Sequence, residues 1–527
     1  ALYTLYIRPV YVSPLRKVPG PPLRRGPLGH FLEMMVSEPG AMSSVWAHKY
    51  GPVVRMIGPF GTEALFFFHP EALKKILVTD CDNYPRPMYL RDFLGLAAGY
   101  GLLTTIRSEH HQLRKLLNPA FSISNINAQV EIYFQYIESI VHNMRKELEG
   151  ESDGKVLHMC ELMGRLTLHI ICETAFGYPT DSQSTSHSDL MAAYRDMATL
   201  QSGSNISKVL ALEMVPGAPA FLRSEWGAKF HSIFSIFPST TPASTLVKAA
   251  WRLRQVSRRI LQDKIAESEL HPEDFANRKD IMSQLLRARN AEMRDGQRLT
   301  DNELVEQVMT FLGAGQETTA SGLSWTLWLL ASHPVVQQQL REEVAHVFDG
   351  SASPDYKEFK DLRWLNCVVM ESLRLLPPIP LTLRQAMVDD YIDGTFVPKG
   401  TLIYVPLRSI NTWKETWGPD AEDFKPERWL DPTSNPKYDA TFSFLGFLAG
   451  PHGCIGKTMA ISEMKAVIAA MVANFEFSPA YEGQAIETSA AISMSKLCSD
   501  LCAFFANQLE TIDPKDNTPL LVRPIRR

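Results

Sequence analysis

Three things are scarce in this chain of 527 residues: paired cysteines, an excess of positive charge, and long apolar runs. Its seven cysteines are scattered and odd in number, which argues against a disulfide framework and favours a reducing compartment. The formal net charge of −5 gives no excess of the basic residues that nucleic acid binding requires, so we expect no nucleic acid partner. No stretch is apolar over the roughly 20 residues that a membrane-spanning helix needs.

The rest of the composition is that of a large globular protein. Apolar residues make up 45% of the chain and charged residues 21%, enough material for an extensive core. Apolar positions recur at helical spacing over about 129–366, with polar linkers expected at 182–188 and 237–244. Short β-branched and aromatic runs predict a hairpin within 47–70 and strands within 391–405. We therefore expect a mainly α fold with a minor β region.

The first motif is GAGQETT, residues 313–319, inside a long helix that is predicted to start at a capping box of Thr300 and Glu303. Two glycines in mid-helix cost about 1 kcal/mol each relative to alanine, so we expect something to lie close against this backbone. Glu317 and Thr318 add an acid and a hydroxyl, a pair suited to ordering water and relaying protons. A kinked helix whose threonine bonds to a preceding carbonyl explains these residues equally well.

The second motif is ESLR, in which Glu371 and Arg374 are three residues apart and share a helix face. The apolar flanks CVVM and LLPP predict that the pair is buried. Because a buried ion pair is costly unless its geometry and hydrogen bonds are good, we interpret it as structural and not catalytic. PERW, residues 426–429, supplies Arg428, which we expect to join Glu371.

The third motif is FLAGPHGCIGK, residues 447–457, which presents Cys454 among three glycines. The apolar spacing that follows predicts a helix over 457–474. A cysteine at a helix N-terminus has its thiolate favoured by free backbone N–H groups and the helix dipole, and the glycines let a flat ligand approach. Two alternatives are a buried structural thiol and a catalytic nucleophile, for which His452 is the only local base.

Together these motifs resemble those of the cytochrome P450 family, in the same order and at similar separations over nearly the whole chain. The resemblance implies the cytochrome P450 fold, with a single haem-thiolate catalytic domain over 23–527. It also identifies 1–22, which ends in VPGPP, as a membrane-proximal segment with a proline hinge.

Site residues follow from the same resemblance. Cys454 corresponds to the axial thiolate ligand of the iron of haem b (heme b), and Glu317 and Thr318 to the pair that delivers protons to bound dioxygen. The remaining haem-binding positions fall on His110, Arg114, Ala314, Arg384, Phe447, Gly450, His452 and Gly456. Glu371, Arg374 and Arg428 correspond to the buried structural network. Histidines 110 and 452 stand where many members have tryptophan and arginine; both keep a nitrogen donor, so we expect propionate binding to survive.

One segment departs from the family pattern. After residues 489–496, the pattern would pass almost directly into 514–524, but LCSDLCAFFANQLETID, residues 497–513, intervenes. This stretch is either a surface excursion or retained non-coding sequence. Its Cys498 and Cys502 are four residues apart without further ligands nearby, which favours a short helix over a metal site.

The resemblance implies a monooxygenase that inserts one atom of dioxygen into a lipophilic substrate and reduces the other to water. Electrons would come from NADPH through a separate NADPH–cytochrome reductase, since no dinucleotide- or flavin-binding motif is evident. Attachment to the cytosolic face of the endoplasmic reticulum membrane, through an N-terminal anchor missing from this chain, is expected, as in fungal microsomal members of secondary metabolism. A reductase-independent isomerase or dehydratase and a non-enzymatic haem-binding protein are the alternatives; Glu317 and Thr318 count against the first.

The substrate pocket is expected to be largely apolar. Its lining should come from residues 88–103, from Phe311 and Ala314, from 379–383 and from the neighbourhood of Met494. Such a lining suits a terpenoid, a fatty acid or an aromatic compound.

Overall fold

The computed structural model describes most of the chain: residues 3–23, 29–30, 33–34, 37, 40–178, 189–190, 192–193, 196, 217–232, 241–290, 299–348, 361–435, 437–484, 488–489, 513–514 and 518–525. The predicted insertion 497–513, apart from its last residue, and Met494 lie outside these ranges. Within them, no helix combines the length and apolar character needed to cross a membrane.

Helices make up most of the described chain. In its first half they are η1 Tyr3–Val12, η2 Pro14–Lys17, α2 Ala41–Tyr50, η3 Pro59–Gly61, α3 Pro70–Lys74, η4 Lys75–Thr79, η5 Cys81–Asn83, α4 Met88–Ala98, α5 Arg107–Leu117, η6 Asn118–Phe121, α6 Ile123–Asn127, α7 Val130–Glu147, α8 Met159–Phe176, α11 Ala218–Arg223, α12 Glu225–Lys229 and α13 Thr241–Leu270. They continue with α14 Pro272–Asn277, α15 Ile281–Asn290, α16 Asp301–Ser332, α17 Pro334–Ala345, α19 Arg363–Leu375, α20 Leu407–Asn411, α21 Lys414–Trp417, η8 Pro426–Trp429, η9 Pro432–Ser434 and α22 Lys457–Asn474. The expectation of a mainly α fold is confirmed.

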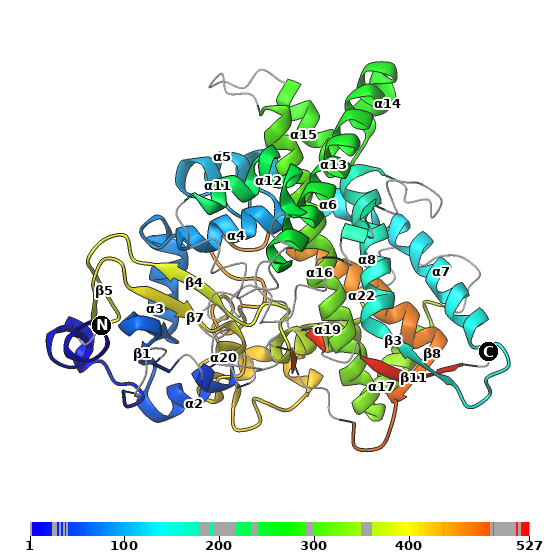
Figure 1. The fold of residues 1–527 in the computed structure, drawn as a ribbon. Helices are drawn as coiled ribbons and strands as arrows, with labels where there is room; N and C mark the ends of the chain where they lie inside the picture. Colours follow the sequence, from blue (N-terminus) through cyan, green and yellow to red (C-terminus); the bar gives the residue numbers. More distant parts are fainter. Residues whose placement is uncertain are drawn as a thin grey trace.

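The strands form small sheets on opposite sides of the helices (Figure 1). The strands are β1 Val53–Ile57, β2 Glu63–Phe67, β3 Lys155–His158, β4 Thr382–Gln385, β5 Asp390–Ile392, β6 Thr395–Val397, β7 Leu402–Val405, β8 Phe475–Pro479, β9 Thr488–Ser489, β10 Asp513–Pro514 and β11 Pro519–Pro524. One sheet has the order β1-β2-β7-β4 and includes the predicted hairpin, in which β1 and β2 pair antiparallel. A second sheet has the order β3-β11-β8, and two pairs, β5-β6 and β9-β10, stand apart. Because β9 pairs with β10, the two flanks of the predicted insertion lie side by side.

Helix α16 runs through the centre of the molecule (Figure 1). It starts at the predicted capping box, where Thr300 Oγ1 accepts the Glu303 N–H at 3.2 Å and Glu303 Oε2 accepts the Thr300 N–H at 2.7 Å. Its residues 304–312 pack in one hydrophobic cluster with α5, α8, α13 and α15, and 320–331 pack in another with α7, α19 and α22. The GAGQET stretch, 313–318, belongs to neither cluster.

One sequence expectation is corrected. Residues 241–244, predicted as the end of a linker, are the first turn of α13, while 237–240 and the other predicted linker, 182–188, lie outside the described residues. The mainly helical stretch also contains the short strand β3. The Pro19 carbonyl accepts the Arg55 N–H at 2.8 Å, and a Cβ on Gly20 would lie 2.1 Å from the Arg55 carbonyl oxygen. Pro19 and Gly20 of VPGPP are therefore packed against β1, and the assignment of 1–22 as a membrane-proximal segment with a proline hinge stays a prediction.

Candidate functional site

The GAGQETT stretch of α16 is where this central helix becomes accessible. Ala314 is exposed, although the helix is almost wholly buried on both sides of this stretch. Its neighbouring glycines face protein: a Cβ on Gly315 would lie 2.7 Å from Ile171 Cδ1 of α8, and one on Gly313 would lie 3.3 Å from the Ala98 Cβ. The close neighbours that the glycines predicted are thus α8 and α4, and Ala314, the position between the glycines, is the accessible one.

The acid and the hydroxyl of this stretch lie beside that accessible position. The Thr318 hydroxyl donates a hydrogen bond of 2.7 Å to the Ala314 carbonyl, one turn back. This is the helix-internal contact that the structural interpretation of the motif predicted. Glu317 is half-buried at the same level. In this structure the hydroxyl proton is engaged within the helix, so a relay would require it to turn.

The cysteine loop, residues 447–456, is shaped by its glycines. Gly450 has a left-handed φ of 75°, and a Cβ there would lie 2.0 Å from the Leu77 carbonyl oxygen. The Gly453 N–H bonds to the Gly450 carbonyl and the Cys454 N–H to the Phe447 carbonyl, both at 2.9 Å. The backbone therefore folds back on itself and holds Cys454 just before α22.

The Cys454 thiol lines an internal cavity. Its side chain is accessible, yet burial raises the pKa of the thiol. A hydrogen bond from the Gly456 N–H and the positive charges of Arg114 and Lys457 act in the opposite direction and favour the thiolate. An accessible thiol that protein surrounds, flanked by groups that favour its anion, is suited to bind a metal ion from one open side.

Phe121 connects this thiol to α16. A Cβ on Gly456 would lie 3.9 Å from both Cys454 Sγ and the Phe121 ring. The Phe121 ring in turn lies 5.7 Å, between centroids, from the ring of Phe311, which is one turn before Ala314 on α16. The loop and the accessible stretch of α16 therefore border the same region of the interior.

Predicted site residues from two other elements, α5 and β4, lie near the loop. Arg114 of α5 donates a hydrogen bond to the Gly453 carbonyl. The rings of His110, also of α5, and His452 are 3.9 Å apart and inclined by 33°. His110 is 2% exposed, and its Nδ1 has no hydrogen-bond partner among the described residues. Arg384 of β4 is 3% exposed and donates to Thr382 Oγ1 and to the Leu383 carbonyl.

The charge of this cluster is positive and uncompensated. In the part of the chain that the structure describes, no carboxylate forms an ion pair with Arg114, Arg384 or their neighbour Arg86. Burial lowers the pKa of Arg384 to about 9, with a further contribution from Arg86. Burial likewise lowers the pKa of His110 to about 4 and of His452 to about 2, and nearby positive charges add to both effects. Buried cations without counter-ions fit an anionic ligand.

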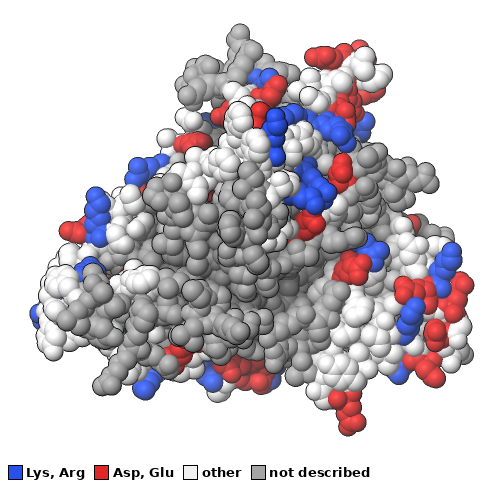
Figure 2. All heavy atoms as spheres, in the orientation of Figure 1, with Lys and Arg blue, Asp and Glu red and all other residues white. Residues whose placement is uncertain are grey.

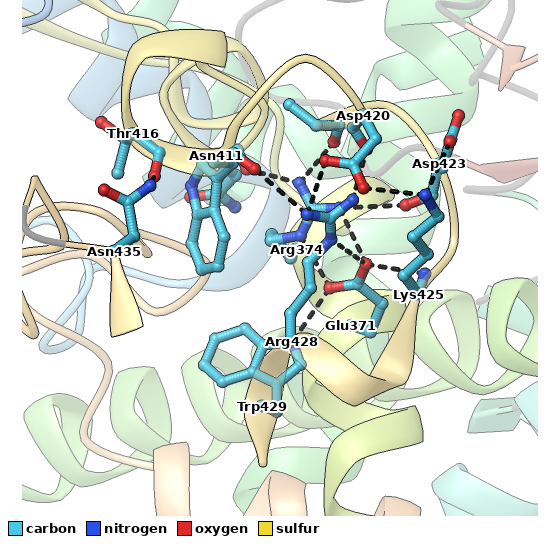
Figure 3. A network of polar contacts seen from close by, with 12 residues as sticks. Glu371, Arg374, Asn411, Thr416, Asp420, Asp423, Lys425, Arg428, Trp429 and Asn435 are labelled. Carbon is cyan, nitrogen blue, oxygen red and sulfur yellow. Dashed lines mark hydrogen bonds and ion pairs between the residues drawn. The ribbon is translucent and has the colours of Figure 1, made fainter. Parts of the chain in front are cut away.

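A second buried cluster, drawn in Figure 3, contains its own counter-ions. Glu371 and Arg374 are both fully buried, as their apolar flanks predicted, and form a bidentate pair of 2.7 and 2.8 Å. Arg428 Nε lies 3.3 Å from Glu371 Oε1, and the Trp429 indole donates to Glu371 Oε2 at 2.9 Å. Carbonyl oxygens of Asn411, Ala421 and Asp423 accept the remaining Arg374 protons. The structure thus brings the three predicted network residues together.

Comparison with known proteins gives a consistent result. The sequence model of the family described as Cytochrome P450 matches residues 19–497. The chain belongs to the cytochrome P450 family. The match ends where the predicted insertion begins, and that insertion stays a prediction.

Curated fungal relatives of this cytochrome P450 match it over most of their length. One is "Cytochrome P450 monooxygenase 205" of Postia placenta, 29% identical over 98% of this chain and 94% of the relative. Another is "Cytochrome P450 monooxygenase sphH" of Aspergillus fumigatus, 30% identical over 90% of this chain and 85% of the relative. A third is "Ganoderic acid synthetase CYP5150L8" of Ganoderma lucidum, 29% identical over 88% and 87%. The chain is thus an oxygen-incorporating oxidoreductase with thiolate-coordinated haem.

The interior of this cytochrome P450 fits such a cofactor. The accessible Cys454 thiol has the chemistry of a haem-iron ligand, and the small side chain of Ala314 leaves room on the side of α16. The uncompensated cluster of Arg86, Arg114, Arg384 and the two histidines fits the two propionates, because these carboxylates would supply the missing counter-ions.

Arg86 was not among the site residues predicted from the sequence. Its guanidinium bonds to the Leu103 carbonyl at 3.0 Å, and burial lowers its pKa to about 10. It also acts electrostatically on Arg384 and His452, which places it in the cationic cluster. The only local signal is an arginine between two prolines, YPRP, residues 84–87, and this pattern alone indicates a turn.

The face seen in Figure 2 shows no comparable accumulation of one charge among the described residues. Lysine and arginine side chains are interspersed there with aspartate and glutamate. The uncompensated positive cluster therefore has no counterpart among the described residues of this face.

Proposed function

We propose that this cytochrome P450 oxidises a lipophilic small molecule with dioxygen, using electrons that a separate NADPH-dependent reductase delivers. The observation that carries the proposal is the accessible Cys454 thiol inside a positively charged interior. Family membership supports the reaction class, and the fungal relatives named as monooxygenases point the same way. When bound, haem would supply the activation of dioxygen.

In this proposal the residues around Cys454 hold the cofactor. Arg114 ties α5 to the loop through the Gly453 carbonyl, and its charge favours the thiolate. Arg86, Arg384, His110 and His452 bind the propionates. Gly450 and Gly456 leave the loop free of side chains where the flat ring must approach.

Proton delivery is assigned to the accessible stretch of α16. Thr318 would turn its hydroxyl from the Ala314 carbonyl toward the cavity and donate its proton there, and Glu317 would resupply the proton from the protein side. The open position at Ala314 supports this assignment, because it brings the helix turn into contact with the cavity. An isomerase or dehydratase would not need this pair.

The structure narrows the predicted pocket lining. Phe311 packs in the core beside Phe121, which leaves it little accessible surface toward Ala314. Ile379 and Leu381 are half-buried apolar residues just before β4, the strand that carries Arg384. We assign the substrate chamber to Ala314 and this segment, and its apolar character supports a lipophilic substrate.

We also propose that the enzyme works at the cytosolic face of the endoplasmic reticulum membrane. Support comes from family membership and from the proposed reductase partner. Isolation of membranes from cells that express the protein, followed by salt and detergent extraction, tests this assignment.

The first test is the absorption spectrum of the reduced protein with and without carbon monoxide. Thiolate ligation predicts a strongly red-shifted Soret band in the parent protein, lost in Cys454→Ser and kept in the control Cys160→Ser, whose half-buried thiol lies on α8. A band typical of histidine ligation in the parent would contradict the assignment of Cys454.

The role of Thr318 is tested by coupling. In Thr318→Ala we expect NADPH oxidation to continue with reductase and substrate, while the product formed per NADPH falls by about tenfold or more, within the usual range for a positioned proton donor. Thr326→Ala is a control, since Thr326 also bonds back to a carbonyl on α16 but is fully buried. Unchanged coupling in Thr318→Ala would exclude the relay.

A further inference from the structure

A short strap, residues 98–102, lies across α16 and is held by three of its side chains. The contacts alternate along the strap: Thr310 Oγ1 donates to the Ala98 carbonyl at 2.9 Å, Glu306 Oε2 accepts the Tyr100 N–H at 2.8 Å, and Gln307 Oε1 accepts the Leu102 N–H at 3.0 Å. Every second residue of the strap is therefore fixed through its backbone by about one turn of the helix.

The residues between these contacts are glycines because the strap lies so close to α16. A Cβ on Gly99 would lie 2.7 Å from the Glu306 carbonyl oxygen and 2.8 Å from the Met309 Cβ. A Cβ on Gly101 would lie 2.5 Å from Thr310 Oγ1. The two glycines of AGYGL, residues 98–102, thus allow the backbone of the strap to pack directly against α16.

Glu306 also joins the strap to a second helix. Its Oε1 accepts two hydrogen bonds from Arg254 of α13, at 2.8 and 3.2 Å. The two side chains are 19% and 16% exposed, so the pair is largely removed from water. One carboxylate therefore holds α13 with one oxygen and the strap with the other.

Tyr100 extends the connection outward. Its hydroxyl donates to the Asp92 carbonyl of α4 at 3.0 Å, and its ring lies 5.0 Å below the guanidinium of Arg223 of α11. Arg223 is also 3.7 Å from Asp92 Oδ1. Helices α4, α11 and α13, which gather around the upper part of α16 in Figure 1, are thereby connected through the strap.

The strap begins beside the accessible stretch of α16. Its first residue, Ala98, lies where a Cβ on Gly313 would be 3.3 Å away, next to the accessible Ala314. We propose that Glu306 is a positioning residue that, together with Arg254, keeps the strap closed over the cavity and thereby limits the passage of large molecules. The proposal rests on the proposed function only in taking this cavity as the substrate chamber.

Of the three α16 side chains that hold the strap, Glu306 is the one whose removal should loosen it most. It is the only charged member of the three α16 side chains, and hydrogen bonds to charged groups are about twice as strong as neutral ones. Replacing it leaves the Tyr100 N–H without its acceptor and Arg254 without its carboxylate in a largely buried place. The neutral contacts of Thr310 and Gln307 remain and keep the strap from unfolding altogether.

The test combines backbone hydrogen exchange with ligand binding to the haem-loaded protein. In Glu306→Ala we expect exchange at residues 99–103 to accelerate by about tenfold, consistent with the loss of one charge-assisted hydrogen bond. A long, multi-ring azole should bind and leave the haem several-fold faster, as followed by its Soret shift. Imidazole itself, which is small enough to pass a closed strap, should keep its rates within about twofold.

Two further variants separate the interactions. Glu306→Gln keeps an acceptor for Tyr100 but loses the charge opposite Arg254, so its effects should be intermediate. Asp301→Asn is the matched control, because Asp301 also lies on α16 and forms an ion pair of 2.6 Å with Arg289 of α15 but does not touch the strap. This variant should leave the binding and release rates of both azoles unchanged, and also the hydrogen exchange rates at residues 99–103.

Unchanged exchange at 99–103 in Glu306→Ala would overturn the proposal, as would equal acceleration for the long azole and imidazole, which would indicate general loosening. Neither measurement needs a reductase or a substrate. A failure of NADPH-driven turnover would therefore count against the proposed function without affecting this result.

Discussion

Two buried clusters of charge in this protein differ in one respect. The cluster of Glu371, Arg374 and Arg428 contains its own counter-ions, and its acid and guanidinium are both fully buried in a bidentate pair. The cluster of Arg86, Arg114 and Arg384 with two histidines has no carboxylate partner among the described residues. Burial without compensation is unfavourable, so the second cluster is incomplete as it stands.

We propose that the first cluster is a structural element and the second a binding site. The first cluster fixes α19 to the segment around η8 whether or not a ligand is present. The second cluster becomes favourable only when an anion is supplied, and haem propionates are suitable anions for a member of this family. Substitutions should therefore act on the folded apoprotein in the first cluster and on cofactor retention in the second.

The largest expected effect comes from Glu371→Gln. Loss of the carboxylate leaves Arg374 and Arg428 without their counter-ion, and we expect the free energy of unfolding of the apoprotein to fall by about 3–5 kcal/mol. Urea titration followed by circular dichroism measures this change. As a control, Glu147→Gln removes the exposed pair with Lys155 and should cost less than about 1 kcal/mol. If both variants lost a similar amount of unfolding free energy, the buried Glu371 cluster would be no more important for stability than an exposed ion pair.

Arg384→Gln should have the opposite pattern. Removing an uncompensated buried cation should leave the apoprotein as stable as before or more stable. Haem affinity should fall by about tenfold or more, because one charged hydrogen-bond donor to a propionate is lost. Haem transfer to apomyoglobin measures the second quantity and urea titration the first. Apoprotein destabilised as much as in Glu371→Gln would show that Arg384 is structural.

The smallest effect is a pH dependence of apoprotein stability. Burial lowers the pKa of His110 to about 4, below the ordinary value of 6.5, so the unfolded chain binds a proton that the folded chain does not. Stability is then complete above pH 6.5 and decreases as the pH falls toward 4, by up to about 1.4 kcal/mol per pH unit for one proton. His110→Gln should reduce this slope between pH 6.5 and 4. If stability depended on pH equally in His110→Gln and in the parent protein, His110 would not be the group that takes up the proton on unfolding.

The features of the site that depend on residues close together in the sequence could be predicted from it. The Thr300–Glu303 capping box, the helix after Cys454 and the burial of ESLR each depend on residues within a few positions, and all three are confirmed. Arg86 was not predictable in this way, since its meaning depends on Arg384, about 300 residues away. The glycines of GAGQETT were read correctly as a close approach, but the approaching elements are α8 and α4.

By itself, the sequence determined the mainly α class, the cysteine loop and the motifs that identify the family, because local spacing and backbone freedom specify them. Only the tertiary structure decided which charges are compensated, that Thr318 bonds to the Ala314 carbonyl, and that Glu306 holds a strap 200 residues earlier in the chain. These facts depend on contacts between side chains of different helices and strands. Whether each contact stabilises or destabilises the fold depends on how far it is buried from water.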